Sequence, residues 1–198
     1  MKKKSLALVL ALAMIVVCVV GGTLAWLTAT TPEVKNTFTY GDINIKLEET
    51  DATVSADGSA TKEFKMIPGY TIAKDPTVTV VKDSEDCYLF VKVEKSSNFD
   101  SFMTYTIADG WTALTGVDGV YYRVVNASTT DQAFDVLKDN QVTVKDTVTK
   151  ADMNALKADG AIQPTLTFTA YAVQLNKNNT TEFTAEEAWA LAKTLPTT

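Results

Sequence analysis

The side chains of this 198-residue chain that could carry chemistry are mainly carboxylates, because the sequence contains no histidine. The densest group is Asp83, Glu85 and Asp86. Three carboxylates this close together could bind Ca²⁺, but the glycine and the terminal glutamate of an EF-hand-type loop are missing. Without histidine, Ser-His-Asp catalysis, Cys-His catalysis and histidine-based zinc sites are excluded. We therefore interpret this group as a solvated turn and predict no catalytic, cofactor-binding or metal site.

The chain has two cysteines, Cys18 and Cys87. Cys18 lies in an apolar leader, so removal of the leader would leave one cysteine and no internal disulfide. Cys87 begins the apolar run Cys-Tyr-Leu-Phe-Val at 87–91. We predict that it is a buried, unreactive thiol rather than a nucleophile.

The first 25 residues have the arrangement of a cleavable secretory signal peptide. Residues 1–4 carry three lysines, residues 6–20 are apolar, and residues 21–25 (Gly-Gly-Thr-Leu-Ala) supply the small residues of a cleavage site. An uncleaved membrane anchor is the alternative, because no charged residue occurs between Lys4 and Glu33. We predict cleavage on the strength of the small residues.

The rest of the chain is acidic. Three of the 18 basic residues and none of the 24 acidic residues lie in the leader, which leaves a net charge of −9 on the remainder. A domain this acidic repels phosphate backbones and anionic lipid surfaces. Nucleic acid is therefore not an expected partner, and contact with a membrane is expected only through an uncleaved leader.

Alternating apolar residues dominate the chain after the leader, as half-buried strands require. Asp-Gly pairs at 109–110 and 118–119, and in the same manner the Asp-Asn pair at 139–140, are typical of hairpin turns between such strands. The alternation predicts strands at 38–47, 64–66, 78–80, 87–94, 103–107, 120–125, 134–137, 142–144 and 165–173. So many short strands with frequent turns predict an all-β, antiparallel sandwich.

Two short helices are expected within this β pattern. Thr149 and Asp152 have capping-box spacing before a connecting helix at 150–158, and Thr184 and Glu187 have it before a C-terminal helix. The second helix, within 184–195, is amphipathic, with its apolar stripe formed by Ala185, Ala188, Trp189 and Ala192. We predict that Trp189 plugs the end of the sandwich core.

Three segments together resemble a known family. They are Gly-Gly-Thr-Leu-Ala-Trp-Leu-Thr at 21–28, Asn-Thr-Phe-Thr-Tyr-Gly-Asp-Ile-Asn-Ile at 36–45, and Phe-Lys-Met-Ile-Pro-Gly-Tyr at 64–70. The leader resembles the signals that SipW-type signal peptidases process. The segment after it is similar to the start of the TasA/camelysin family of secreted matrix proteins, and the Pro-Gly turn is similar to the turn ahead of that family's next strand.

This resemblance implies how the protein is processed and what it does. Cleavage would follow Ala25, so the mature chain would begin at Trp26 and form a jelly-roll-like β-sandwich over residues 26–198. Family members assemble into extracellular biofilm fibres on the surface of Gram-positive-type bacteria, with a SipW-type signal peptidase as processing partner. Camelysin is described as a metallopeptidase, and here this chain departs from it, because it has no histidine and no His-Glu-x-x-His. The resemblance therefore implies a structural matrix subunit and not an enzyme.

The segment from Trp26 to Lys35 is a candidate for assembly. It begins with Trp26 and Leu27, is rich in threonine, and contains Pro32, which disfavours helix. The hypothesis is that this segment pairs with a sheet edge of the next subunit, so that copies join head to tail, with the same chain or a related matrix subunit as partner. A tail without fixed structure, or an edge strand within its own subunit, are the alternatives.

Two other function classes remain open at this level. A surface adhesin or carbohydrate-binding sandwich would need an exposed aromatic platform, for which Trp111, Tyr121 and Tyr122 are the candidates. A secreted hydrolase would need two carboxylates in one cleft, and distant strands can supply such a pair without any local signature.

Overall fold

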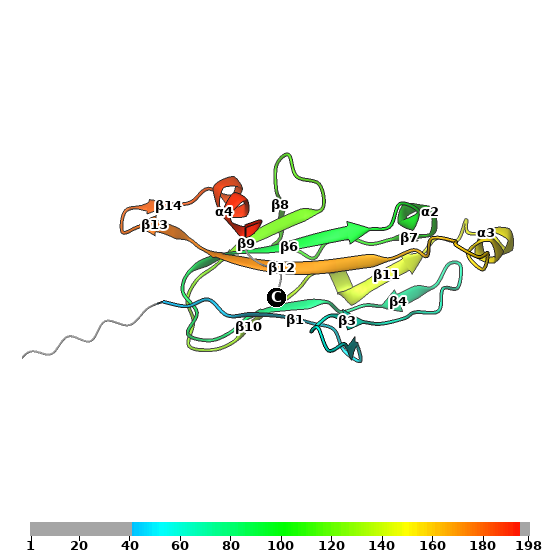
Figure 1. Ribbon diagram of the computed structural model, residues 1–198, viewed down its shortest axis with the longest axis horizontal. Helices are drawn as coiled ribbons and strands as arrows, with labels where there is room; N and C mark the ends of the chain where they lie inside the picture. The colour runs from blue at the N-terminus through cyan, green and yellow to red at the C-terminus, as the bar shows by residue number, and fades with distance from the viewer. Residues whose placement is uncertain (1–40, 195–198) are drawn as a thin grey trace, which may run out of the picture. The chain divides into compact units, whose positions relative to one another are not determined.

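The structure is a computed structural model that describes residues 41–194. Within these residues the protein consists mostly of antiparallel strands with a few short helices (Figure 1), which confirms the prediction of an all-β fold. The predicted leader, its cleavage site at Ala25 and Trp26, and the assembly segment with Leu27 and Pro32 lie outside the described residues.

The largest sheet has four strands in the order β12-β6-β9-β8. Its strands are β6 (Cys87–Lys95), β8 (Thr112–Ala113), β9 (Val120–Val125) and β12 (Leu166–Gln174). The longest ladder joins β12 to β6 along their whole length, from Leu166 opposite Lys95 to Gln174 opposite Cys87. β6 lies in the interior of the sheet because its residues 87–91 are apolar at every position and are buried on both faces.

Two three-stranded sheets complete the β framework. One has the order β1-β5-β10 and the other has the order β4-β11-β7. Their strands are β1 (Ile45–Glu48), β4 (Thr71–Ala73), β5 (Thr77–Val80), β7 (Met103–Thr104), β10 (Gln132–Asp135) and β11 (Gln141–Val144). Two hairpins stand apart from these sheets: β2 (Thr53–Val54) with β3 (Ala60–Thr61), and β13 (Asn176–Asn178) with β14 (Thr181–Glu182).

The main core lies between the four-stranded sheet and β1-β5-β10. Leu89, Val91 and Val93 of β6 pack there against Val78 and Val80 of β5, and all five side chains are at most 5% exposed. This is the inward-facing set that the alternation predicts. A second cluster joins β11, the short helix α2 (Phe99–Phe102) and the start of β12.

Helix α4 (Ala185–Ala192) covers the other face of the four-stranded sheet (Figure 1). Trp189 is 5% exposed, and its ring lies 5.4 Å from that of Phe90 and 5.3 Å from that of Tyr171. The predicted apolar stripe is confirmed, since all four of its members are buried. β6 is therefore covered on both sides, by the sandwich core on one and by α4 on the other.

Several local predictions are wrong. Residues 64–66 keep the expected alternation of burial but form no strand, and only Met103 and Thr104 of the stretch 103–107 do so. Residues 109–110 do not close a hairpin, because β7 pairs with β11 whereas β8 pairs with β9. Residues 139–140 do not close one either, because β10 pairs with β5 whereas β11 pairs with β4 and β7. The positive φ angles of Asp139 and Asn140 instead redirect the chain from one sheet to the next. Helix α2 was not predicted.

Both predicted capping boxes are present. Thr184 accepts a hydrogen bond from the backbone N–H of Glu187, and the Glu187 carboxylate accepts one from the backbone N–H of Thr184. Thr149 and Asp152 form the same pair at α3 (Lys150–Ala155), which ends three residues before the predicted boundary. The capping signals therefore fix where these helices begin more accurately than the apolar pattern fixes where they end.

Substituting Thr184 with alanine should lower the free energy of unfolding by about 1 kcal/mol, because the backbone N–H of Glu187 loses the hydroxyl oxygen that accepts its hydrogen bond. Urea denaturation measures this change. Thr149→Ala is the matched control. It removes the same cap from α3, which buries no residue, so this helix can fray locally and the global effect should be smaller. Equal losses for the two variants would contradict this expectation.

Candidate functional site

A groove lies between β1 and β12 in residues 41–194. Each strand lies at the end of its own sheet, since β1 is paired with β5 and β12 with β6, and neither has a second partner in these residues. The two strands lie next to each other without forming a ladder. The groove along them has a volume of about 1450 Å³.

Apolar side chains from both edge strands and from the segment 64–72 line the groove. Because side chains alternate along a strand, one parity of each edge strand faces inward. The residues that supply this lining are Ile43, Ile45, Leu47, Phe64, Met66, Ile72, Leu166, Phe168, Ala170 and Ala172. All ten side chains are half-buried. The groove is thus a part of the sandwich core that the two sheets leave open on one side.

One ion pair lies in the wall of this groove. The Lys74 Nζ is 2.8 Å from Oε2 of Glu49, and the two side chains are only 12% and 13% exposed. The same Nζ lies 5.3 Å from the ring centres of both Phe64 and Phe168. Oε1 of Glu49 is buried and has no hydrogen-bond partner. The wall of the groove therefore contains one buried acceptor that no donor of the described residues satisfies.

The chemistry of the groove fits an extended peptide. An edge strand presents backbone N–H and C=O groups that can pair with another chain, and alternate side chains of that chain could then enter the apolar space. Residues 41–194 contain no group of three or more side chains placed to hold a metal ion. The groove thus combines the two features that strand addition uses, an open strand edge and apolar space beside it.

The acidic group at 83–86 forms a structured turn. Asp83 has φ of +63°, and its backbone N–H donates to the carbonyl of Ser128. The Asp86 carboxylate accepts from the backbone N–H of Ala127 at 2.6 Å. Ser84 is 4% exposed, and its hydroxyl donates to the carbonyl of Val81. These bonds tie the turn to the loop at 126–131.

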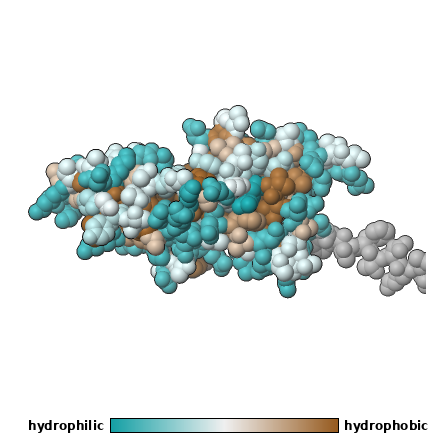
Figure 2. Space-filling view, turned by 180° about the vertical axis from the view of Figure 1, so that it is seen from behind, coloured by the Kyte–Doolittle hydropathy of each residue, from teal (hydrophilic) through white to brown (hydrophobic). Residues whose placement is uncertain are grey.

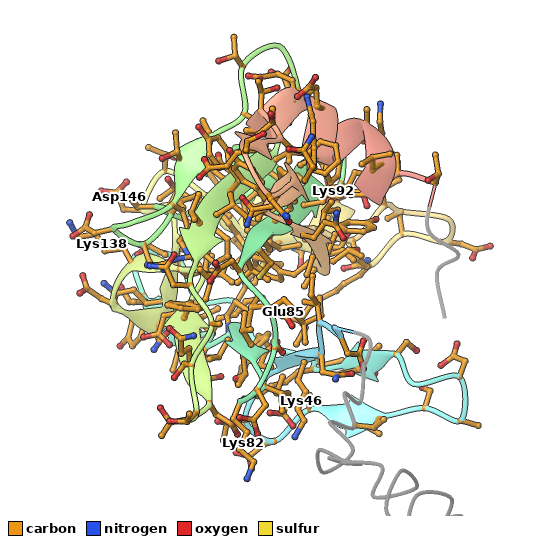
Figure 3. The ribbon with its side chains drawn as sticks, turned by 90° about the vertical axis from the view of Figure 1, so that its left-hand side faces the viewer. Lys46, Lys82, Glu85, Lys92, Lys138 and Asp146 are labelled. Atoms are coloured by element: carbon orange, nitrogen blue, oxygen red, sulfur yellow. The ribbon has the colours of Figure 1, made fainter. Side chains whose placement is uncertain are left out.

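The other charged residues are spread over the surface. Lys92 lies on the side of the domain that carries α4, and Lys46 and Lys82 lie on the opposite side (Figure 3). On the face seen in Figure 2, hydrophilic residues cover most of the surface and apolar residues gather in a few patches. The labelled side chains in Figure 3 do not converge on one cavity.

The three aromatic candidates have separate environments. Tyr122 packs with Tyr88 and Phe90 in the cluster under α4. Trp111 and Tyr121 are half-buried at the edge of the main core, where the Trp111 Nε1 donates to the carbonyl of Asp135. The structure therefore divides the three side chains between two faces of one sheet. An unpredicted residue, Arg123, lies beside Trp111.

Cys87 is fully buried, as its apolar surroundings predict. Burial and, to a smaller extent, the nearby Asp86 carboxylate raise the pKa of its thiol from 9.0 to about 11. Both causes disfavour the thiolate, which is the reactive form. The thiol therefore belongs to the core.

The raised pKa of Cys87 predicts a loss of stability at alkaline pH. In the unfolded chain the thiol loses its proton from about pH 9, whereas the folded chain keeps it until about pH 11. Its contribution to stability is thus complete below pH 9 and is lost as the pH rises towards 11. Urea denaturation at pH 8 and pH 10.5 should show a larger loss for the wild type than for Cys87→Ala, in which the other titrations are unchanged. Equal losses would contradict the assignment.

Comparisons of the chain with models of protein families, with curated proteins and with solved structures find no match. In the part of the chain that the structure describes, no helix has the length and apolar character needed to span a bilayer.

Reasoning from the sequence did not predict the ion pair of Lys74 and Glu49 or the position of Arg123 beside two aromatic rings. A polar residue at an inward-facing position of a predicted strand, as at Arg123 between Tyr121 and Val125, is the signal that could have identified the second.

Proposed function

We propose that this protein is a secreted, extracellular matrix subunit that has no enzymatic activity of its own and that assembles by strand addition. Residues 26–35 of one copy would lie in the groove between β1 and β12 of the next copy and pair with the free edge of β12. The observation that carries this proposal is the groove itself, an apolar space bordered by two strands that have no second partner in residues 41–194.

Energetic considerations support a strand as the occupant. A strand in the groove would satisfy backbone groups of both edges and cover the partly exposed side chains of Phe168 and Leu47. Burial of apolar surface contributes roughly 25 cal/mol per Å², and the hydrogen bonds fix the register of the added strand. The segment that one copy donates and the groove that accepts it are different surfaces of the same chain. Such a contact is therefore head to tail and continues into an open fibre.

The features of the leader support export. The basic start, the apolar stretch and the small residues up to Ala25 suit a SipW-type signal peptidase, which would release a chain that begins at Trp26. The proposed site of action is the surface of a Gram-positive-type bacterium. The packing of two smaller sheets on one larger sheet is compatible with the jelly-roll-like sandwich of TasA/camelysin proteins, and that arrangement is part of the proposal.

Deleting residues 26–35 behind an intact leader and cleavage site tests the proposal. Mass spectrometry of the exported wild type should give Trp26 as the first residue, and electron microscopy should show fibres. The deletion should abolish these fibres without changing the thermal unfolding of the domain. Fibres that still grow from the shortened chain would refute assembly through this segment.

Replacing Thr31 with serine is the matched control. It keeps the length, the aromatic start and Pro32 of the segment and removes only one methyl group, so fibres should persist. Replacing Trp26 and Leu27 with serine should weaken assembly, because the apolar anchors are lost. Retention of the first 25 residues on the exported protein would instead show a membrane stalk.

A further inference from the structure

Arg123 is the only arginine of the chain, and its surroundings are unusual for a charged residue. It lies on β9, on the face of the four-stranded sheet that turns towards the main core, opposite Leu89 of β6. The centre of its guanidinium group is 3.9 Å from the ring centre of Phe134 and 5.4 Å from that of Trp111. The group thus lies against Phe134 of the opposite sheet and near Trp111, which directly precedes β8 of its own sheet.

The guanidinium has no charged partner in residues 41–194. Its Nε is buried without a hydrogen-bond partner, and none of its nitrogens forms an ion pair with a described carboxylate. The acids next to these aromatic residues in the sequence have other partners. The Asp135 carboxylate accepts a hydrogen bond from the Thr77 hydroxyl, and Oδ1 of Asp109 lies 3.9 Å from Nζ of Lys138. Burial lowers the pKa of Arg123, and no carboxylate offsets this effect.

A stacked, uncompensated guanidinium is suited to binding an anion. Contact with Phe134 and Trp111 restricts the motion of the guanidinium group, whose parallel N–H donors match a planar acceptor. Gly110 allows this placement, because a Cβ at this residue would lie 3.0 Å from Nη2 of Arg123. One positive charge matches a monoanion better than a phosphate dianion, and the acidic remainder of the protein disfavours polyanions.

We propose that Arg123, together with Trp111 and Phe134, forms a binding site for the carboxylate of a small organic acid, either free or as an acidic sugar residue. The carboxylate accepts from the two Nη groups at the edge of the stack. The body of the ligand lies against the aromatic side chains at this margin of the core. This site is independent of the proposed assembly groove, which other strands form.

The single arginine makes the test specific, since its Nε–H gives one side-chain signal in a ¹H–¹⁵N NMR spectrum. The full chain is expressed with ¹⁵N in a Gram-positive host and titrated with acetate, glucuronate, glucose and sodium chloride. We expect saturable shifts of the Arg123 Nε–H and the Trp111 indole N–H with the two carboxylates, and none with glucose or with salt at equal ionic strength. Stronger binding of glucuronate than of acetate identifies an acidic sugar as the ligand, and equal binding identifies the carboxylate alone.

Two substitutions provide the controls. Arg123→Lys keeps the charge but loses the planar guanidinium group. The ligand concentration that gives half of the maximal Trp111 shift should therefore rise by at least about tenfold. Lys92→Met removes a cation from the opposite face of the same sheet and should leave binding unchanged. Should Arg123→Lys unfold, the wild-type titration decides by itself.

Two results would overturn the inference. The first is the absence of any saturable shift of the wild-type signals with either carboxylate. The second concerns Glu33, the only acidic side chain outside residues 41–194. Binding that occurs in Glu33→Gln but not in the wild type would show that the chain's own carboxylate fills the site.

Discussion

Replacing Trp189 with alanine should lower the free energy of unfolding by about 3–5 kcal/mol. The indole is 5% exposed and contacts the rings of Phe90 and Tyr171, so its removal leaves a cavity between α4 and the four-stranded sheet. The sheet cannot close this cavity, because β6 is held on its other face by the main core. Urea denaturation followed by far-UV circular dichroism measures the change.

Leu191→Ala is the matched control for Trp189. It lies on the same helix and also loses apolar atoms, although fewer than the indole contains, and its side chain is 44% exposed. Its substitution should therefore cost well under half as much. If both variants lost the same free energy, α4 would contribute through its helical propensity and not through the packing of its indole. If Trp189→Ala unfolded at the same urea concentration as the wild type, α4 would not be docked on the sheet in solution.

Placing a lysine at Ala170 should prevent assembly, because it puts a charge into the apolar groove beside β12. Gln174→Lys is the matched control, as it adds the same charge to the same strand at an exposed position that does not line the groove. Electron microscopy should show fibres for Gln174→Lys and none for Ala170→Lys. Both variants should retain the thermal unfolding transition of the folded domain.

Mixing two defective chains separates the donor from the acceptor. A chain without residues 26–35 keeps its groove, whereas Ala170→Lys keeps its N-terminal segment. If strand addition joins the copies, the mixture should yield heterodimers in size-exclusion chromatography, although neither chain elongates alone. Fibres from Ala170→Lys alone would show that the groove is not the acceptor, even if residues 26–35 remain necessary. Such an outcome would leave the Arg123 site unaffected.

Local sequence signals predicted the elements that depend on neighbouring residues. The alternation at 87–93 gave the correct inward set on β6, and the spacing of Thr184 and Glu187 gave the correct start of α4. The same alternation at 64–66 predicted the pattern of burial but not the lack of a ladder. Burial depends on the side chains of the segment itself, whereas a ladder also requires a partner strand at the right place.

The candidate sites required information that no local pattern contains. The groove exists because β1 and β12, which are distant in the sequence, both lie at the ends of their sheets. The stack of Arg123 likewise joins β9 to Phe134 of β10 on the opposite sheet. Pairings between distant segments are selected by the packing of the whole domain, and several pairings are compatible with one alternating pattern.

By itself, the sequence determined the all-β character of the domain, the caps of its helices and its acidic, histidine-free surface chemistry, because these follow from residue types and short spacings. Only the tertiary structure decided which edges remain open, which face of β6 α4 covers, and which aromatic rings enclose Arg123. These features depend on which strands become neighbours, and that choice is made by the fit of side chains between sheets.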